Sequence, residues 1–178
     1  LSMTLYGDLD YSVIDELPPG RRPVITRLFN AGQKEYIYKA IAEETKKGSQ
    51  VYVVYPVIEE TEKTNLKSAI MGKEALEKIF PNLKVELIHG RLKPQERENI
   101  MASFKSGAIN LLVSTTVIEV GVDVPNAAMM LIVHAERFGL SQLHQLRGRV
   151  GRGGSQSYCF LLMYEPLSED ARRRLDIM

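Results

Sequence analysis

Short, almost wholly apolar segments alternate along most of the chain with longer segments of mixed polarity. Residues 51–54 and 111–113 are apolar at successive positions, whereas a strand with one face in solvent would alternate apolar and polar side chains. Uninterrupted runs of this length are typical of strands that are buried on both faces of a parallel sheet. The apolar runs predict six strands, at residues 24–29, 51–55, 84–88, 109–114, 129–133 and 158–163.

The intervening segments carry apolar residues at the three- and four-residue spacing of amphipathic helices. They predict helices at 33–47, 66–80, 94–105 and 140–149, and a further helix at 168–175 that begins with the N-capping residue Ser168. Strand–helix alternation at this spacing predicts an α/β domain of three layers, with a mainly parallel sheet and helices on both faces. Residues 1–23 are rich in turn formers and are expected to be a connector from a preceding domain, which leaves 24–178 as one domain.

Three of the predicted strands are followed directly by segments with binding chemistry. These segments are Pro56-Val57, His89-Gly90-Arg91 and Thr115-Thr116. Open parallel sheets bind their ligands beyond the carboxyl ends of the strands. We therefore expect the three segments to lie along one edge of the sheet and to form a working surface there.

Composition places the chain among ordinary globular domains. It is 44% hydrophobic and 25% charged with a net charge of +1, and no apolar run approaches the roughly 20 residues of a membrane span. Cys159 is the only cysteine, so an internal disulfide is excluded, and a cytoplasmic location without membrane partners is expected. The arginines cluster at 147–152 and 172–174, and such local charge is more informative than the total.

Residues 145–154 read Gln-Leu-Arg-Gly-Arg-Val-Gly-Arg-Gly-Gly. This segment resembles motif VI of superfamily 2 helicases, whose pattern is Q-x-x-G-R-x-G-R. A helical wheel places Gln145, Arg149 and Arg152 on one stripe, with Leu143 on the opposite side. Arginine binds phosphate with a planar fork that stays charged. The resemblance implies that Arg149 and Arg152, with Gln145, are catalytic and contact the γ-phosphate of ATP held by another lobe, whereas the structural alternative is a solvated basic helix end.

Residues 112–125 form a second motif, Leu-Val-Ser-Thr-Thr-Val-Ile-Glu-Val-Gly-Val-Asp-Val-Pro. It resembles motif V of the RecG and transcription–repair coupling branch. Hydroxyls and free backbone N–H groups after a strand suit a nucleic-acid phosphate. The resemblance implies that Thr115 and Thr116 bind the nucleic-acid backbone, that Gly121 approaches ATP closely, and that Asp123 lies near the ATP ribose. Ordinary capping and turn chemistry is the alternative.

A third segment, residues 87–94, resembles the His-Gly turn by which such lobes meet DNA. The resemblance implies DNA contacts by His89, Gly90 and Arg91. Glycine lets the main chain approach a phosphate, and arginine adds positive charge. A plain loop that ends with Pro94 at the first position of a helix explains part of the same pattern.

Taken together, the motifs resemble the second RecA-like lobe of bacterial RecG-type DNA helicases over nearly the whole chain. The resemblance implies an ATP-dependent helicase that acts on branched or forked DNA in recombination and replication-fork repair. The sequence has no G-x-x-x-x-G-K-[ST] phosphate loop, so a first lobe of the same polypeptide is expected to hold the ATP phosphates and Mg²⁺, and the chain alone is expected to be inactive.

Two other functions fit parts of the pattern. A transcription–repair coupling translocase shares motifs V and VI, and only the flanking sequence separates it from the RecG type. A non-catalytic α/β module that binds nucleic acid or protein is the second alternative, although a mere binder has no need of Gln145, Arg149 and Arg152 in register. His134 is expected at a rim or interface and Arg147 in packing or a lobe interface, without catalytic roles.

Overall fold

The computed structural model describes residues 22–57, 62–115 and 123–178, apart from the side chains of 62–64. Within these ranges all six predicted strands are present. Their bounds are β1 Ile25–Asn30, β2 Gln50–Tyr55, β3 Val85–Ile88, β4 Leu111–Thr115, β5 Ala127–Val133 and β6 Tyr158–Met163. The predicted helices are also present, as α1 Lys34–Lys46, α2 Glu62–Ile79, α3 Pro94–Lys105, α4 Leu140–Arg147 and α5 Glu169–Asp176. Two short 3₁₀ helices, η1 (Ala31–Gln33) and η2 (Ala135–Arg137), complete the described elements.

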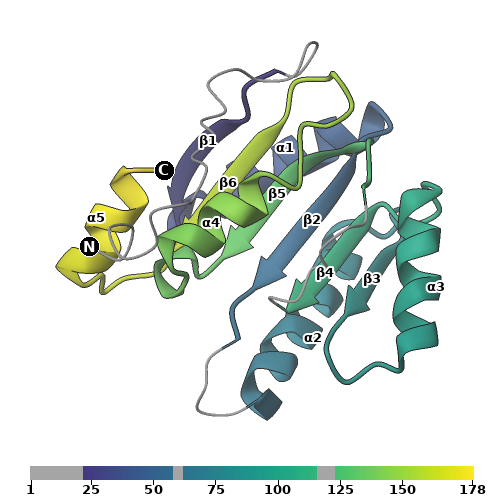
Figure 1. The fold of residues 1–178 in the computed structure, drawn as a ribbon, viewed down its shortest axis with the longest axis horizontal. Coiled ribbons are helices and arrows are strands. Elements are labelled where there is room, and N and C mark those ends of the chain that lie inside the picture. The colour runs from purple at the N-terminus through teal and green to yellow at the C-terminus, as the bar shows by residue number, and fades with distance from the viewer. Residues whose placement is uncertain (1–21, 58–61, 116–122) are drawn as a thin grey trace, which may run out of the picture.

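The strands form one sheet in the order β1-β6-β5-β2-β4-β3, and every neighbouring pair is parallel (Figure 1). Strand β2 lies inside the sheet, where Val53 is in register with Val113 of β4 and Leu131 of β5. All seven residues of β5 are buried, as expected for a strand that is covered on both faces. The predicted mainly parallel sheet is confirmed.

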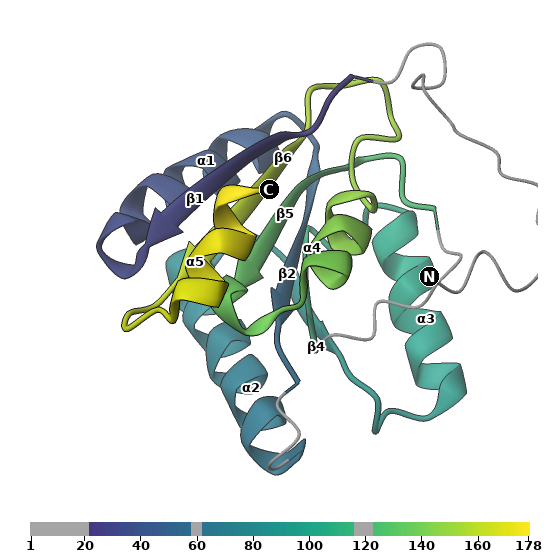
Figure 2. The ribbon, with the colours of Figure 1, turned by 60° about the vertical axis from the view of Figure 1, so that its left-hand side comes forward.

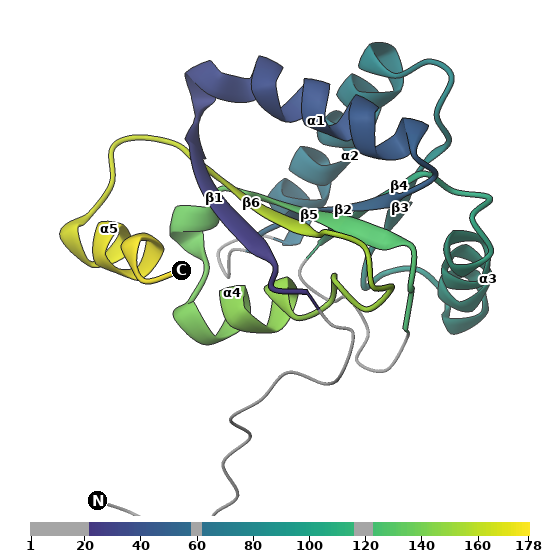
Figure 3. The ribbon, with the colours of Figure 1, turned by 90° about the horizontal axis from the view of Figure 1, so that it is seen from above.

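Helices cover both faces of the sheet and make three layers (Figures 2 and 3). Successive strand side chains point to opposite faces, so Val51 and Val53 pack in the core under α1 and α2. Tyr52 and Val54 pack in the second core, to which α3 and α4 contribute their buried side chains. Burying a Val or Leu side chain fully stabilises the fold by roughly 1.5–3 kcal/mol relative to leaving it exposed. Moving a helix to the other face would expose its buried side chains, so the two cores determine which helix lies on which face.

Local chemistry explains where several helices begin and end. Pro94 opens α3, and the carboxylate of Glu96 accepts a hydrogen bond from the Lys93 amide at 2.9 Å. Ser168 caps α5 through its hydroxyl oxygen, which accepts from the Ala171 amide at 3.2 Å. Among the described helices, none combines the length and the apolar character that crossing a membrane requires.

Two predicted helix boundaries were wrong by more than one residue. Helix α2 begins at Glu62, four residues before the predicted start at 66. The pattern predicted a helix at 140–149, but α4 ends at Arg147 and Gly148 is its C-cap. The helical wheel therefore does not extend to Arg149 and Arg152, because the glycines after Arg147 weaken the helix. Residues 1–21 of the predicted connector lie outside the described residues, and the division at residue 24 stays a prediction.

Candidate nucleotide and nucleic-acid sites

Helix α4 presents the arginine segment by burying its other side. Leu143 and Leu146 are buried in the core on the sheet, whereas Gln145 is exposed. This part of the predicted wheel is confirmed. Strands β5 and β6 are parallel, so the chain that leaves the carboxyl end of β5 must return to the amino end of β6, and α4 makes most of that return. The segment after α4 therefore emerges near the amino ends of the strands.

The residues after α4, which we call the arginine loop (148–154), continue in turns instead of a helix. The Arg149 amide donates to the Leu146 carbonyl at 3.0 Å, and Val150 is fully buried. Gly151 then adopts φ +84°, a left-handed conformation that a residue with a side chain rarely adopts. This turn places Arg152 on the surface, where its side chain is 39% exposed.

A second segment, Asp123–Pro125, meets the arginine loop directly. Gly153 lies so close to the Pro125 carbonyl that an added Cβ would overlap its oxygen. Close to this contact in the chain, Nη1 of Arg152 lies 3.4 Å from Oδ1 of Asp123. The structure therefore brings together two residues, separated by 29 positions, that the sequence assigned to different parts of one ATP molecule.

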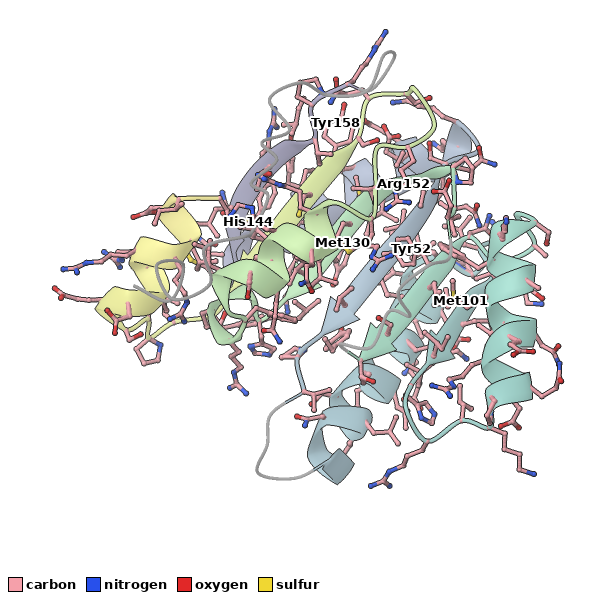
Figure 4. All side chains as sticks on the ribbon, viewed as in Figure 1. Tyr52, Met101, Met130, His144, Arg152 and Tyr158 are labelled. Carbon is pink, nitrogen blue, oxygen red and sulfur yellow. The ribbon has the colours of Figure 1, made fainter. Side chains whose placement is uncertain are left out.

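Tyr52 of β2 lies below this pair and was missed by the sequence analysis. Its side chain is 1% exposed, and its ring packs edge-on against Phe104 with 4.8 Å between the ring centroids. Burial raises the pKa of Tyr52 to about 12, against the opposing effect of the nearby Arg149 and Arg152 guanidinium groups. Figure 4 shows Tyr52 close to Arg152 of the arginine loop. A polar aromatic residue among the valines of a central strand was the available signal.

Arg149 differs from Arg152 in its surroundings. It is half-buried, and no hydrogen bond or ion pair joins its guanidinium to a residue that the structure describes. It lies near the uncharged Tyr52 phenol instead. A guanidinium that is partly removed from water without an anion beside it favours binding of one, because a charge-assisted hydrogen bond replaces lost solvation.

A separate site lies at the carboxyl ends of the strands. Val57, His89, Gly90, Arg91 and Thr115 line one pocket of about 220 Å³, together with Asn65 and Leu66 of α2. The expectation that the segments after β2, β3 and β4 share an edge is confirmed for these residues, which we call the carboxyl rim. Thr116 and Gly121 lie outside the described residues.

The His89 turn has a defined hydrogen-bond pattern. The Arg91 amide donates to Nδ1 of His89 at 3.3 Å, and the Leu92 amide donates to the His89 carbonyl at 3.2 Å. Burial and the Arg91 charge lower the pKa of His89, while Glu96 opposes them. At Gly90 an added Cβ would meet no atom within 4 Å, so the main chain there is open to a ligand.

The two residues without an assigned role have structural partners. His134 follows β5 in a left-handed conformation with φ 54°, stacks on Tyr164 at 4.1 Å, and has Nδ1 3.0 Å from Oε1 of Glu136. Arg147 donates to the carbonyl oxygen of Met178 at 3.3 Å and lies 3.0 Å from Nδ1 of His144. Both residues therefore serve local packing in the described structure.

Comparisons with known proteins identify the class to which this fold and site belong. Residues 28–154 match the family model "Helicase conserved C-terminal domain", and the chain belongs to that family. Two further solved structures, each under 25% identical to this chain, share only the fold. These are Mss116p domain 2 bound to an RNA duplex (TM-score 0.60, 19% identity, 79% of this chain and 54% of that one) and Saccharomyces cerevisiae Dbp5 bound to RNA and ADP BeF3 (TM-score 0.64, 18% identity, 91% and 41%).

Within that family, the similarity is to RecG. The chain is 55% identical over its whole length to the ATP-dependent DNA helicase RecG of Synechocystis sp., and 53% identical over 98% of its length to that of Aquifex aeolicus. It spans only 21% and 22% of those relatives. The structure of RecG bound to a three-way DNA junction matches with a TM-score of 0.80 and 46% identity, over 99% of this chain and 23% of that one.

These similarities confirm the resemblance to RecG-type helicases that was inferred from motifs V and VI. They also confirm the RecA-like α/β fold class. The two alternative functions gain no support, because the relatives at 53–55% identity are named RecG.

Proposed function

We propose that this chain is the C-terminal motor lobe of an ATP-dependent DNA helicase that acts on branched DNA in recombination and replication-fork repair. The similarity to RecG over the whole chain supports the type of enzyme. The observation that carries the catalytic assignment is the arginine loop, where Arg149 has no anionic partner among the described residues and Arg152 is exposed. Neither side chain is enclosed by its own fold, so both are available to a nucleotide held by another lobe.

In this proposal Arg149 and Arg152 contact the γ-phosphate of ATP, and Gln145 assists from the exposed side of α4. Negative charge spreads over the transferred phosphoryl group, and a preset guanidinium stabilises it without the cost of reorganising water. Such arginine fingers typically contribute about 10³–10⁵ in rate. Gly121 and Asp123 are assigned to the adenosine end, with the Asp123 carboxylate near the ribose.

The rest of the ATP site belongs to the preceding lobe of the same polypeptide. A phosphate loop is absent from the sequence, and in the described ranges no group of three or more His, Cys, Asp or Glu side chains is placed to hold a metal ion. Mg²⁺ would bind to the first lobe and to the phosphates, and would neutralise charge there. This chain contributes the arginines to the other side of the nucleotide.

We assign DNA binding to His89, Gly90, Arg91 and Thr115 of the carboxyl rim, and to Thr116, which follows Thr115 in the sequence. The open main chain at Gly90 and the charge of Arg91 suit a strand phosphate. The rim and the arginine loop lie toward opposite ends of the strands, because α4 returns the chain to the amino end of the sheet. Closure of the lobes on ATP would therefore move the rim as part of one rigid sheet, and reopening after hydrolysis would move it back.

The test is substitution of each arginine by alanine in the full-length protein. Arg149→Ala and Arg152→Ala are each expected to lower DNA-stimulated ATP turnover by about 10³-fold and to leave DNA affinity and the unfolding midpoint near wild type. Lys39→Ala is the matched control, since Lys39 is an exposed cation on α1, which covers the opposite face of the sheet. Near-normal turnover in both arginine variants would remove the catalytic assignment.

A further inference from the structure

The two arginines of the arginine loop are not equivalent, and their difference carries an inference that rests on the proposed function. Arg152 has an anionic partner, Asp123, at 3.4 Å. Among the described residues, none forms a hydrogen bond or ion pair with the Arg149 guanidinium. A nucleotide phosphate can therefore approach the Arg149 guanidinium directly. The Arg152 guanidinium would bind the same phosphate while it also contacts the Asp123 carboxylate.

The backbone conformation around Arg152 brings it close to Asp123. Arg152 stands between two glycines that cannot be replaced without strain. Gly151 is left-handed with φ +84°, and an added Cβ would also lie 3.1 Å from Cγ2 of Val24. Gly153 touches the Pro125 carbonyl with no room for a side chain. The backbone on both sides of Arg152 is therefore held, and so is its distance from the segment that carries Asp123.

The guanidinium can serve two partners at once. It carries five N–H donors in a planar fork, and the contact with Asp123 uses the Nη1 arm. Within the described residues no other hydrogen bond or ion pair uses the remaining donors, so they can face a phosphate. Tyr52 lies near both arginines and Asp123, and it is buried with its ring packed edge-on against Phe104. The contact with the carboxylate thus restricts the orientations open to the exposed side chain.

The ion pair between Arg152 and Asp123 contributes little to the stability of the fold. The side chains of Arg152 and Asp123 are 39% and 53% exposed, and ion pairs at such exposure contribute little to folding because water and salt screen them. Orientation of a catalytic group is different, since a misplaced guanidinium loses transition-state contacts even when the protein is fully folded. The effect of the pair should therefore be found in catalysis.

We infer that Asp123 is a positioning residue for Arg152: its carboxylate orients the guanidinium so that the free donors of the fork face the γ-phosphate. This role goes beyond contact with the ribose. A ribose ligand acts mainly on ATP binding and hence on KM, whereas a residue that orients an arginine finger acts on the chemical step and hence on kcat.

Asp123→Asn separates the two roles. Asparagine keeps an oxygen that can accept a hydrogen bond from a ribose hydroxyl, but it loses the charge that holds Arg152. In the full-length protein with saturating forked DNA, we expect kcat for ATP to fall roughly tenfold and KM to stay within about twofold of wild type. Asp123→Glu, which restores the charge, should recover part of kcat. Glu74→Gln on α2 is the control for loss of an exposed carboxylate and should leave both constants unchanged.

A double-mutant cycle identifies the partner of Asp123. With Arg152→Lys, which removes the fork but keeps the charge, adding Asp123→Asn should lower kcat by less than about twofold more. With Arg149→Lys, the same addition should retain its full effect, roughly tenfold, because Arg149 does not pair with Asp123. Coupling with Arg152 and additivity with Arg149 is the expected pattern.

Three results would overturn the inference. One is an unchanged kcat in Asp123→Asn, whatever its KM, which would leave a ribose contact only. The second is full additivity of Asp123→Asn with Arg152→Lys. The third is loss of discrimination between ATP and 3′-deoxy-ATP in Asp123→Asn with normal kcat. Failure of the proposed function looks different, since Arg149→Ala and Arg152→Ala would then turn over ATP normally whatever Asp123 does.

Discussion

Gly153 and the carbonyl oxygen of Pro125 are in direct contact, and no side chain fits between them. This contact joins the arginine loop to the segment that carries Asp123. Gly153→Ala should push the two segments apart at a cost of about 2 kcal/mol in the free energy of unfolding, because overpacking against backbone cannot be relieved by a rotamer change. Urea unfolding of the chain measures this cost, and ATP turnover of the full-length variant should fall with it.

The control for Gly153→Ala is Gly90→Ala. An added Cβ at Gly90 meets no atom within 4 Å, and its change in unfolding free energy should stay within about 0.5 kcal/mol. Equal free energies of unfolding for the two variants would show that the contact between Gly153 and Pro125 can yield to a side chain, which contradicts the expectation.

Arg91 of the carboxyl rim provides a test of DNA binding. If it meets one backbone phosphate, Arg91→Ala should weaken DNA binding at low salt and reduce the slope of log K against log [salt] by about 1. Filter binding or fluorescence anisotropy of the full-length protein across a salt series measures the slope. Lys39→Ala changes the net charge equally on a distant helix and should leave the slope unchanged. An unchanged slope in Arg91→Ala would place the DNA elsewhere.

His89 should make folding sensitive to mild acid. Its pKa in the folded protein is lowered from 6.5, chiefly by burial, and its Nδ1 accepts the Arg91 amide. The unfolded chain therefore takes up the proton first as pH falls through 6.5, and the free energy of unfolding should decrease from that point downward. His89→Asn should remove this part of the pH dependence. An imidazole signal of His89 that titrates at or above 6.5 in NMR would contradict the expectation.

Tyr52 and Tyr55 should limit stability at high pH. Burial raises the pKa of each from 10.0 to about 12 in the folded protein. Below pH 10 both phenols are neutral in the folded and in the unfolded protein, so they do not affect the free energy of unfolding. Between pH 10 and 12 the phenols ionise in the unfolded chain first, and the free energy of unfolding decreases. Tyr52→Phe should reduce this loss. Phenolate absorbance measures the ionisation, and two buried tyrosines that ionise near 10 in the folded state would refute the assignment.

The pattern of the sequence predicted the fold well because its signals are local. Uninterrupted apolar runs located every described strand, helical spacing located every described α-helix, and the α3 and β6 boundaries agreed fully. One error was the start of α2, which lies at Glu62 and not at 66, and the other fell where glycines recur after α4. The arginine stripe was extended past Arg147 although Gly148 and Gly151 end the helix and turn the chain, a choice between helix and turn that residue spacing does not decide.

Residue types and their order in the chain determined the α/β layers and the two core faces, and they are the basis of the proposed phosphate contacts of the arginines. Only the tertiary structure decided that Asp123 meets Arg152 and that Tyr52 lies beneath both. The common edge of Val57, His89 and Thr115 was expected from the sequence, and the structure adds that they line one pocket. The physical reason is that the spacing of apolar residues shows only which side of a single helix or strand is buried. The meeting of two loops from different strands depends on how the whole sheet and its helices pack.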